Sequence, residues 1–549
     1  MADATTASPS MMTGASDSER IQPKRLFAFI IMVFGMFMAI LDIQVVATSL
    51  PTIQEALGIT PDAMSWVQTA YLIAEIIAIP LTGLLTRVFS LRWLFVGAVS
   101  IFTAASLGCA MSGSFHMLLA FRVLQGFFGG LLIPVVFSAV FLLFPARLHA
   151  VATTIGGVVA VLAPTIGPVV GGFITNTWSW PWLFLINIVP GIIAALMTPS
   201  LLPKQRMNLI ELDKLDLLAL MLLAVSLASL ELGLKEAPKG GWLSSNCIAL
   251  LVLSGSCLTL LIQRLLASPH PILRLGSFQR RSFTLGCVSS FCLGIGLFGS
   301  VYLMPVFLAF VRQHDAFEIG KIMLVTGVAQ LIAAPLVTAL DGKVDARLLT
   351  SFGFALFSAG LAASAFQPAS ADYQEMFWPQ VVRGVGIMFC LLPPTRIALG
   401  DLPQAEVADA SGLFNLMRNL GGAIGIALID TIIYGRVGLH AQAFRDRLMA
   451  GDTAAAKAIG LAPELLRNRP RGVSEEAAIA YVRPLVEKAS LALCVNEAWA
   501  LLAGVALLGF ILIPFARNRT ESPSPRRLAL EAAQPALRRR LDQLGPRSG

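Results

Sequence analysis

Long apolar stretches separated by short polar connections repeat along the whole chain. Each stretch is about 20 residues or more, which is the length that a helix needs to cross the hydrocarbon core of a membrane. Transmembrane β-strands need only about 10 alternating residues, so the pattern favours a helical bundle. The predicted spans are residues 26–50, 65–86, 92–112, 116–143, 150–175, 181–202, 215–234, 246–266, 282–310, 318–340, 347–367, 374–399, 408–435 and 494–516.

The composition agrees with an integral membrane protein. Of 549 residues, 56% are hydrophobic and only 13% are charged, and the mean hydropathy is +0.76. These are too few charges to cover the surface of a soluble protein of this size. The predicted fold class is therefore all-α, with fourteen transmembrane helices.

Basic residues indicate the orientation, because short connections rich in Lys and Arg stay cytoplasmic. An even number of spans puts both termini on one side. The first tail and the connections on its side carry most of the basic residues, whereas the short opposite connections carry only Lys235, Lys239, Arg312 and Lys321. We therefore predict that both termini are cytoplasmic, and the net charge of +8 does not indicate a nucleic-acid partner.

Two similar segments indicate an internal repeat. "FRVLQGFFGGLLIP" (121–134) in the fourth span resembles "PQVVRGVGIMFCLLP" (379–393) in the twelfth, which aligns Arg122 with Gln380 and Gln125 with Arg383. Repeated halves are typical of secondary transporters. The predicted division is a disordered cytoplasmic N-tail (1–25), a six-helix half (26–202), two inserted helices with their loops (203–281), a second six-helix half (282–516) that includes an external loop (436–493), and a basic cytoplasmic C-tail (517–549).

The external loop breaks the pattern of short connections. Within it, "AKAIGLAPELL" (456–466) and "SEEAAIAYVRPLVEKA" (474–489) have helical spacing, and Ser474 is a candidate N-cap of the second helix. We expect either an ordered external cap of two short helices or a docking surface for a partner.

Charged residues inside predicted spans are expensive to bury and are candidates for function. Asp42 lies about eight residues inside the outer end of the first span, and Arg122 lies at a similar depth in the fourth. These two residues are natural partners, either in proton coupling or as a purely structural ion pair. Glu75 lies near the middle of the second span with no basic neighbour within one turn, and burial favours its protonated form. It is a second candidate for the proton site, and the alternative is a protonated carboxyl bonded to a backbone carbonyl.

Other polar residues within spans are candidates for the substrate cavity, and for Arg383 and Asp430 functional and structural roles are equally open. The candidates for the cavity are Gln44, Gln125, Arg383, Asn415 and Asp430.

The fifth span contains small residues at helical spacing and a proline. Small residues let helices approach closely, and proline bends the helix axis. Gly126 of the fourth span and four residues of the fifth span are therefore candidates for a role in conformational change. The residues of the fifth span are Gly167, Pro168, Gly171 and Gly172.

These motifs resemble the major facilitator superfamily, specifically its fourteen-span drug:proton antiporter branch of the EmrB/QacA type, from about residue 26 to 516. "LDIQVVATSLP" (41–51) is similar to the first-span motif, and "RVLQG" (122–126) is similar to the fourth-span motif. "APTIGPVVGG" (163–172) is similar to the fifth-span antiporter motif, and "ASGLFNLMRNLGGAIGIAL" (410–428) to the thirteenth span. The resemblance implies that the kinked fifth span closes the pathway against leaks and favours antiport.

One motif departs from this pattern. The connection after the second span usually has a Gly, an Asp four residues later and then a second Gly, but here it reads "GLLTRVFSLRW" (83–93). Arg87 stands at the Asp position and Ser90 at the second Gly, whereas Arg92 keeps a basic position.

Enzyme chemistry has little support in the sequence. The five histidines are scattered over loops and span ends, and no span shows a Ser/His, His/His or paired-carboxylate motif. The seven cysteines have no paired spacing and resemble small packing residues rather than disulfides or metal ligands. We therefore expect no cofactor and no metal.

The expected function is proton-coupled efflux of amphipathic or lipophilic compounds across the bacterial inner membrane by alternating access. Two alternatives stay open: an exporter of one endogenous metabolite or siderophore, and a non-transporting membrane sensor or membrane-embedded enzyme. Expected partners are the small-molecule substrate, protons and membrane lipid. The long external loop and the EmrB-like "NEAW" (496–499) also suggest a periplasmic membrane-fusion adaptor and an outer-membrane channel.

Overall fold

The computed structural model describes residues 23–144, 146–204, 207–208, 216–268, 271–272, 275–341, 343–400, 402, 404–462 and 475–516. Within these ranges the chain is helical, apart from turns and one isolated bridge between Asp341 and Val344. The α-helices are α1 (Pro23–Ala56), α2 (Pro61–Met64), α3 (Trp66–Ala78), α4 (Thr82–Ala110), α5 (Phe115–Leu143), α6 (Ala146–Thr177), α7 (Trp182–Leu185), α8 (Ile188–Leu201), α9 (Leu217–Gly240), α10 (Ser245–Ala267), α11 (Arg281–Val306), α12 (Ala316–Leu340), α13 (Ala346–Ser364), α14 (Tyr373–Leu399), α15 (Gln404–Met449), α16 (Thr453–Ala458) and α18 (Glu475–Leu512).

The helices agree with the fourteen predicted spans. Among the described residues, thirteen helical segments are long and apolar enough to cross a membrane. One of them, Trp66–Ala110, is 45 residues long and breaks at Ser90, where the backbone leaves the helical conformation. This segment holds both the second and the third predicted spans, so the prediction of fourteen spans is confirmed.

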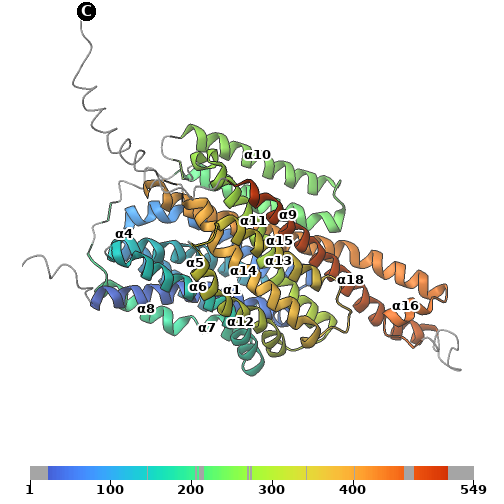
Figure 1. The fold of residues 1–549 in the computed structure, drawn as a ribbon. Coiled ribbons are helices and arrows are strands. Elements are labelled where there is room, and N and C mark those ends of the chain that lie inside the picture. The colour runs from blue at the N-terminus through green and yellow to red at the C-terminus, as the bar shows by residue number, and fades with distance from the viewer. Residues whose placement is uncertain are drawn as a thin grey trace, which may run out of the picture.

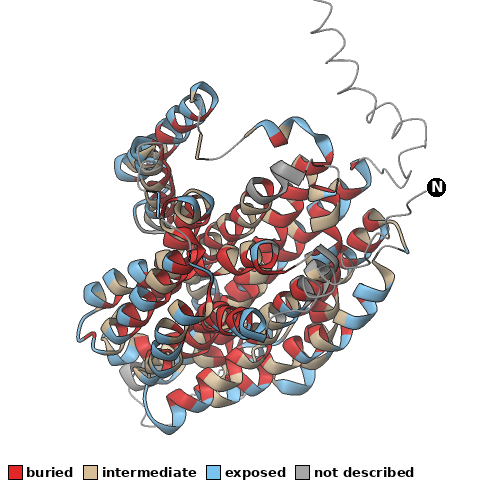
Figure 2. Cartoon of the chain, turned by 90° about the vertical axis from the view of Figure 1, so that its left-hand side faces the viewer, coloured by how far each residue is buried: buried red, intermediate tan, exposed pale blue. Residues whose placement is uncertain are grey.

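The helices form two groups and an added pair. Helices α1 to α8 pack on one another, and helices α11 to α18 form a second group. The two groups meet where α6 packs on α12, α3 on α15, and α1 on α11. Helices α9 and α10 pack side by side at the edge of the bundle, and α9 contacts α15 and α3 (Figure 1). Buried residues line the interior of the bundle, and exposed ones lie on its outer surface (Figure 2). Many exposed side chains on this surface are apolar, such as Leu196 and Ile332, as expected where lipid is the solvent.

The external loop differs from its prediction. Helix α15 does not end at 435 but continues to Met449, and α18 runs without interruption from Glu475 into the last span. Together with the short helix α16, these extensions form a helical hairpin that projects beyond the bundle (Figure 1). The hairpin has a small core of its own, centred on Phe444, Ile459 and Val486. The cap is therefore built on extended spans rather than on two separate helices, and the predicted cap residue Ser474 lies outside the described residues.

The predicted tails lie mostly outside the described residues. Helix α1 begins at Pro23, three residues before the predicted start of the first span, and residues 1–22 and 517–549 are not among those described.

Ser90 occupies a backbone conformation that glycine normally supplies. Its φ of 68° and ψ of 160° lie in a region that is essentially restricted to glycine. Its buried hydroxyl has no hydrogen-bond partner among the described residues. The same turn is held to the segment after α8, because Arg92 donates to the Leu202 carbonyl and the Asn208 amide donates to the Val88 carbonyl at 2.8 Å. Ser90 therefore takes up a glycine-type conformation at the position where the motif discussed above usually has its second Gly.

Replacing Ser90 by Gly is expected to stabilise the protein by about 1 kcal/mol. Relief of about 1–3 kcal/mol of backbone strain exceeds the added unfolded-state entropy of glycine, about 0.5–1 kcal/mol. The measurement is the thermal unfolding midpoint of purified protein in detergent. Ser100→Gly is the control, because Ser100 lies within the same helix in a helical conformation and should lower the midpoint. A lower midpoint for Ser90→Gly would contradict this account.

Three polar residues tie together the connections that precede α12 and α14. Arg312 Nη2 donates to Asp372 Oδ2 at 2.8 Å, and His314 Nε2 lies 3.0 Å from Asp372 Oδ1. Asp372 also caps the N-terminus of α14. Burial alone would raise the pKa of Asp372, but hydrogen bonds from Arg312, the Tyr373 backbone and His314 outweigh it and lower that pKa from 3.8 to about 2.

Asp372→Asn is expected to lower the thermal midpoint at neutral pH, and the difference from the native protein should depend on pH. A carboxyl whose folded pKa is depressed contributes stability that is fully present above its unfolded pKa and is lost as the pH falls through its folded pKa. The difference should therefore stay nearly constant down to about pH 5, decrease as the pH falls further, and become small near about pH 1. Thermal melts of both proteins across this pH range measure the difference. A difference in midpoint that does not change with pH would mean that the charge of Asp372 does not contribute to stability.

Candidate functional site

Asp42 is the centre of a buried polar network in the first group of helices. It lies on α1 and is 1% exposed, and its two carboxylate oxygens receive two donors from α5 and one from the turn before α8. Arg122 Nη1 lies 2.5 Å from Oδ2, and Oδ1 accepts from Gln125 Nε2 at 2.9 Å and from Asn187 Nδ2 at 2.8 Å. The pairing of Asp42 with Arg122 agrees with their similar predicted depth. An ionised carboxylate with three donors is well solvated by the protein.

Arg122 is fixed on several sides. Its Nε donates to the Val67 carbonyl at 2.9 Å, and its Nη1 also donates to Gln125 Oε1 at 2.8 Å. The guanidinium carbon lies 4.4 Å from the centre of the Tyr71 ring and 5.8 Å from that of Phe184. Helices α1, α3, α5, α7 and the turn before α8 therefore meet at one ion pair. Removing one partner of such a pair is strongly destabilising, because it leaves a buried charge uncompensated.

Glu75 lies at the contact between the two groups of helices. It is 2% exposed on α3, and its carboxylate accepts a hydrogen bond from Asn419 of α15. The positive charge of Arg418, which also lies on α15, acts on the Glu75 carboxylate. Glu75 Oε2 has no hydrogen-bond partner among the described residues. As predicted, Glu75 has no basic neighbour within one turn of its own helix, but the charge of Arg418, which is distant in the sequence, acts on it from α15.

Asp430 of α15 also joins the two groups of helices. Tyr302 of α11 donates to its Oδ1 at 2.7 Å, and Ser65, which precedes α3, donates to its Oδ2. One turn further along α15, Tyr434 donates to the Pro61 carbonyl at 2.8 Å. These bonds hold α15 to the segment that precedes α3 in this conformation.

Arg383 is buried in the second group with no acidic partner among the described residues. Its Nη2 donates to Thr326 Oγ1 at 2.8 Å, and its guanidinium carbon lies 5.3 Å from the centre of the Trp499 ring. Thr326 in turn donates to Gln380 Oε1 at 3.0 Å, and Arg383 Nε and Nη1 have no hydrogen-bond partner among the described residues. Arg383 therefore differs from Arg122, which pairs with the Asp42 carboxylate.

The two remaining substrate candidates are engaged within the bundle. Gln44 is 6% exposed and packs against α6, and its Oε1 has no partner among the described residues. Asn415 donates to the Ser411 carbonyl at 3.0 Å and accepts from Arg418 at 2.8 Å.

Two cavities among the described residues lie away from the substrate candidates. One of 590 Å³ lies beside the N-terminal end of α1 and the C-terminal end of α8, and one of 480 Å³ lies between α1, α6 and residues 309–319. Neither is lined by Gln44, Gln125, Arg383, Asn415 or Asp430. Gln125 belongs to the Asp42 network instead.

The glycines of the fifth span face two different neighbours. A Cβ on Gly167 or Gly171 would clash with Gln44 or Val45 of α1, within the first group. A Cβ on Gly172 would clash with the backbone of Ala316, which begins α12 in the second group. Pro168 lies against Gly320 in the same way, and Thr165 Oγ1 donates to the Gly327 carbonyl at 3.2 Å. This span therefore joins α1 on one face and the opposite group on the other.

Gly126 lets α5 approach α3, because a Cβ there would meet the backbone of Tyr71. The same contact positions Tyr71 over Arg122.

Sequence reasoning missed three residues of this site. Asn187 and Tyr71 gave weak signals, a single amide near the start of a span and a single phenol within one. Arg418 gave a stronger one, because it is an arginine inside a predicted span and should be treated as functional by default.

Comparison with known proteins gives consistent results. The sequence profile described as Major Facilitator Superfamily matches residues 32–426. The colistin resistance protein EmrB of Acinetobacter baumannii is 40% identical over 416 residues, which cover 75% of this chain and 81% of that protein. The multidrug export protein EmrB of Escherichia coli is 30% identical over 484 residues, covering 88% and 93%. Among solved structures, an inward-facing, occupied bacterial homologue of the human lysosomal transporter Spinster shares the fold, with a TM-score of 0.58, 14% identity, and coverage of 90% of this chain and 97% of that one.

Proposed function

Because the chain belongs to the Major Facilitator Superfamily, we propose that it is a proton-coupled multidrug efflux antiporter that exports amphipathic or lipophilic compounds by alternating access. It is a transporter rather than an enzyme, and a multi-pass protein of the inner membrane. The names of its relatives, which refer to multidrug export and colistin resistance, support this class of substrate.

The observation that carries proton coupling is the position of Glu75 between the two groups of helices. Ionised Glu75 attracts Arg418 across the interface and accepts from Asn419. Protonation removes that attraction, so it changes the relative free energies of the conformations that do and do not make this contact. A proton can therefore bias alternating access without touching the exported compound, which is the coupling that antiport requires.

Asp42 and Arg122 complete the proposed proton-coupling set with Glu75. Tyr71 lies one turn before Glu75 on α3 and covers Arg122, so the charge of Arg122 acts on both carboxylates. A change of protonation at Glu75 therefore changes the electrostatic potential at the Asp42–Arg122 ion pair.

Among the proposed substrate contacts, Arg383 has the most support. Two of its nitrogens have no hydrogen-bond partner in the part of the chain that the structure describes, and a buried unpaired cation favours a ligand with an acceptor group. Gln44 is the next candidate, because its Oε1 has no hydrogen-bond partner among the described residues. Gln125, Asn415 and Asp430 are hydrogen-bonded to neighbouring residues in this conformation.

The proposal extends to orientation and partners. Both termini are cytoplasmic, which rests on the distribution of basic residues. The projecting hairpin of α15, α16 and α18 would then face the periplasm, where it offers a place for a membrane-fusion adaptor that continues the path to an outer-membrane channel.

Purified protein in liposomes tests the function. With an imposed pH gradient, compounds from an amphipathic panel should drive a substrate-dependent proton flux, because one proton moving down 100 mV supplies about 2.3 kcal/mol. Absence of such flux for every compound, in protein that binds them, would overturn proton coupling.

Glu75→Gln is expected to abolish uphill transport while the protein folds and binds substrate. Gln keeps the acceptor for Asn419 but cannot titrate, so the interface stays in its uncharged state. The measurement is gradient-driven uptake beside equilibrium substrate binding. Glu487→Gln, on the exposed surface of α18, is the matched control and should transport normally. Normal gradient-driven uptake by Glu75→Gln would remove Glu75 from the mechanism.

A further inference from the structure

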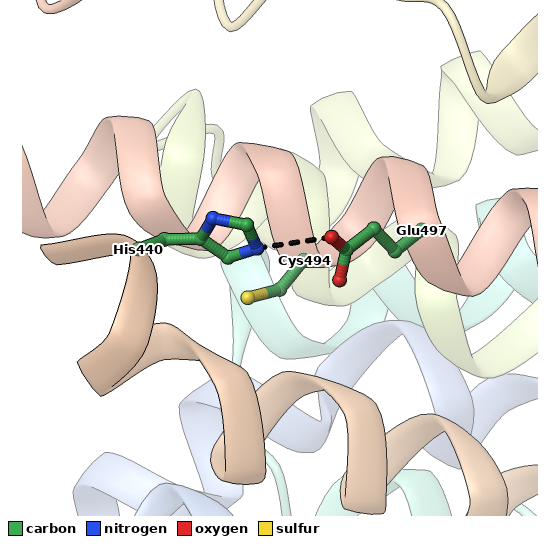
Figure 3. Close-up of side chains that lie close together, drawn as sticks. All are labelled: His440, Cys494 and Glu497. Carbon is green, nitrogen blue, oxygen red and sulfur yellow. Dashed lines mark hydrogen bonds and ion pairs between the residues drawn. The ribbon is translucent and has the colours of Figure 1, made fainter. Parts of the chain in front are cut away.

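We propose that His440, Cys494 and Glu497 form a binding site for a divalent transition-metal ion of the Zn²⁺ type at the base of the external hairpin. The three side chains lie together where α15 and α18 leave the bundle (Figure 3). This inference does not depend on the proposed transport function, and it revises the prediction that the cysteines only fill space.

The positions of the side chains suit a shared ion. Cys494 and Glu497 are three residues apart on α18, so they lie on one face of the helix, and His440 reaches them from α15. His440 Nε2 lies 3.0 Å from Glu497 Oε1, and the nitrogen, sulfur and carboxylate oxygen all lie within 4.8 Å of one another. Tetrahedral zinc holds its ligand atoms roughly 3.5 Å apart. Side-chain rotations that move the ligand atoms by about 1 Å would bring them to this spacing.

The chemistry of the three ligands is selective. Imidazole nitrogen, thiolate and carboxylate oxygen together favour zinc and its neighbours over magnesium or calcium, which prefer oxygen ligands alone. Three protein ligands leave a fourth position for water. On binding, the Cys494 thiol loses its proton to solvent and a sulfur–metal bond forms.

The partial exposure of two of the three side chains leaves a route for the ion from solvent. The side chains of His440 and Glu497 are 22% and 30% exposed, whereas Cys494 is fully buried. An ion can therefore meet the imidazole and the carboxylate first and then reach the sulfur behind them.

Arg436 is the group that competes with a metal ion. Its Nη1 lies 3.2 Å from Glu497 Oε2, and its side chain is 53% exposed and free to turn outward. A simple charged clamp of His440, Glu497 and Arg436 would also join the two helices. The two explanations predict opposite effects of removing the Arg436 charge. A charged clamp would become weaker, whereas metal binding would become tighter.

Cobalt titration of the full chain, purified in detergent with any polyhistidine tag removed and stripped with chelator, tests the site. We expect one Co²⁺ per chain, a thiolate-to-cobalt charge-transfer band, and loss of that band when Zn²⁺ is added. Cys494→Ser should eliminate the band, and His440→Ala should weaken binding about 10-fold or more. Cys257→Ser, a buried cysteine on α10, is the control and should leave the band intact.

Arg436→Gln is the decisive variant, because it should tighten cobalt binding. Should Cys494→Ser fail to fold, the Zn²⁺-dependent rise in the thermal midpoint of the native protein, absent from His440→Ala, gives a second readout. Folded native protein that shows no charge-transfer band, or a band that survives Cys494→Ser, would overturn the site.

Discussion

Replacing Asp42 by Asn is expected to abolish proton-driven uphill export while the protein that folds still binds substrate. Asn keeps the size of the side chain and one acceptor, but it carries no charge and cannot titrate. On our proposal it resembles the protonated carboxyl and holds the transporter in one half of its cycle. The effect should be among the largest of any single substitution, because Asp42 receives Arg122, Gln125 and Asn187 at once.

The same substitution also has a structural effect that must be separated from the first. It leaves Arg122 buried without a counter-charge, which costs about 3–5 kcal/mol and should lower the yield of folded protein. Adding Arg122→Gln removes the unpaired charge, so the double variant should recover yield but not uphill transport. The measurements are purified yield, substrate binding and gradient-driven uptake for both variants. Normal coupled transport by Asp42→Asn would exclude Asp42 and leave Glu75 as the proton carrier.

Gly172→Ala is expected to open the contact between α6 and α12, which joins the two groups of helices, and to slow export strongly. Its Cβ would lie far inside contact distance of the Ala316 backbone, which no side-chain rotation can relieve. Overpacking of this kind costs about 1–3 kcal/mol, which shifts the balance between conformations by about 5- to 150-fold.

Spin labels at Thr177→Cys and Lys321→Cys, near the outer ends of α6 and α12, measure this opening as a longer distance. Two variants in the same helix serve as comparisons. Gly157→Ala has open space around it and should change nothing, whereas Gly171→Ala clashes with Val45 of the same group and should reduce stability without separating the labels. An unchanged distance in a folded Gly172→Ala protein would mean that this contact does not control the outer side.

Local patterns were enough to predict the number and place of the spans. The length and apolarity of a segment decide whether it crosses a membrane, and neither depends on distant contacts. The ends of the spans were less secure. Nothing local separates the last turn in the membrane from a helix that continues into water, so α15 was predicted to end at 435 and in fact reaches Met449.

The depth of buried charges was also available from the sequence, because a helix rises about 1.5 Å per residue. That rule placed Asp42 and Arg122 at the same level, and the structure pairs them. It could not supply Asn187 or the Arg418 that faces Glu75, because depth says nothing about which helices are neighbours. Those contacts depend on how the groups of helices pack.

The sequence by itself determined a fourteen-span helical bundle, its resemblance to drug antiporters, and the buried charges worth testing. Only the tertiary structure decided what each of them faces. Gly171 and Gly172 are adjacent in one motif, yet one contacts α1 and the other contacts the opposite group. Likewise His440 and Cys494 meet only because α15 and α18 leave the bundle side by side. Successive residues on a helix point about 100° apart, so the rotation of each helix against its neighbours, which the sequence does not state, assigns every side chain its partner.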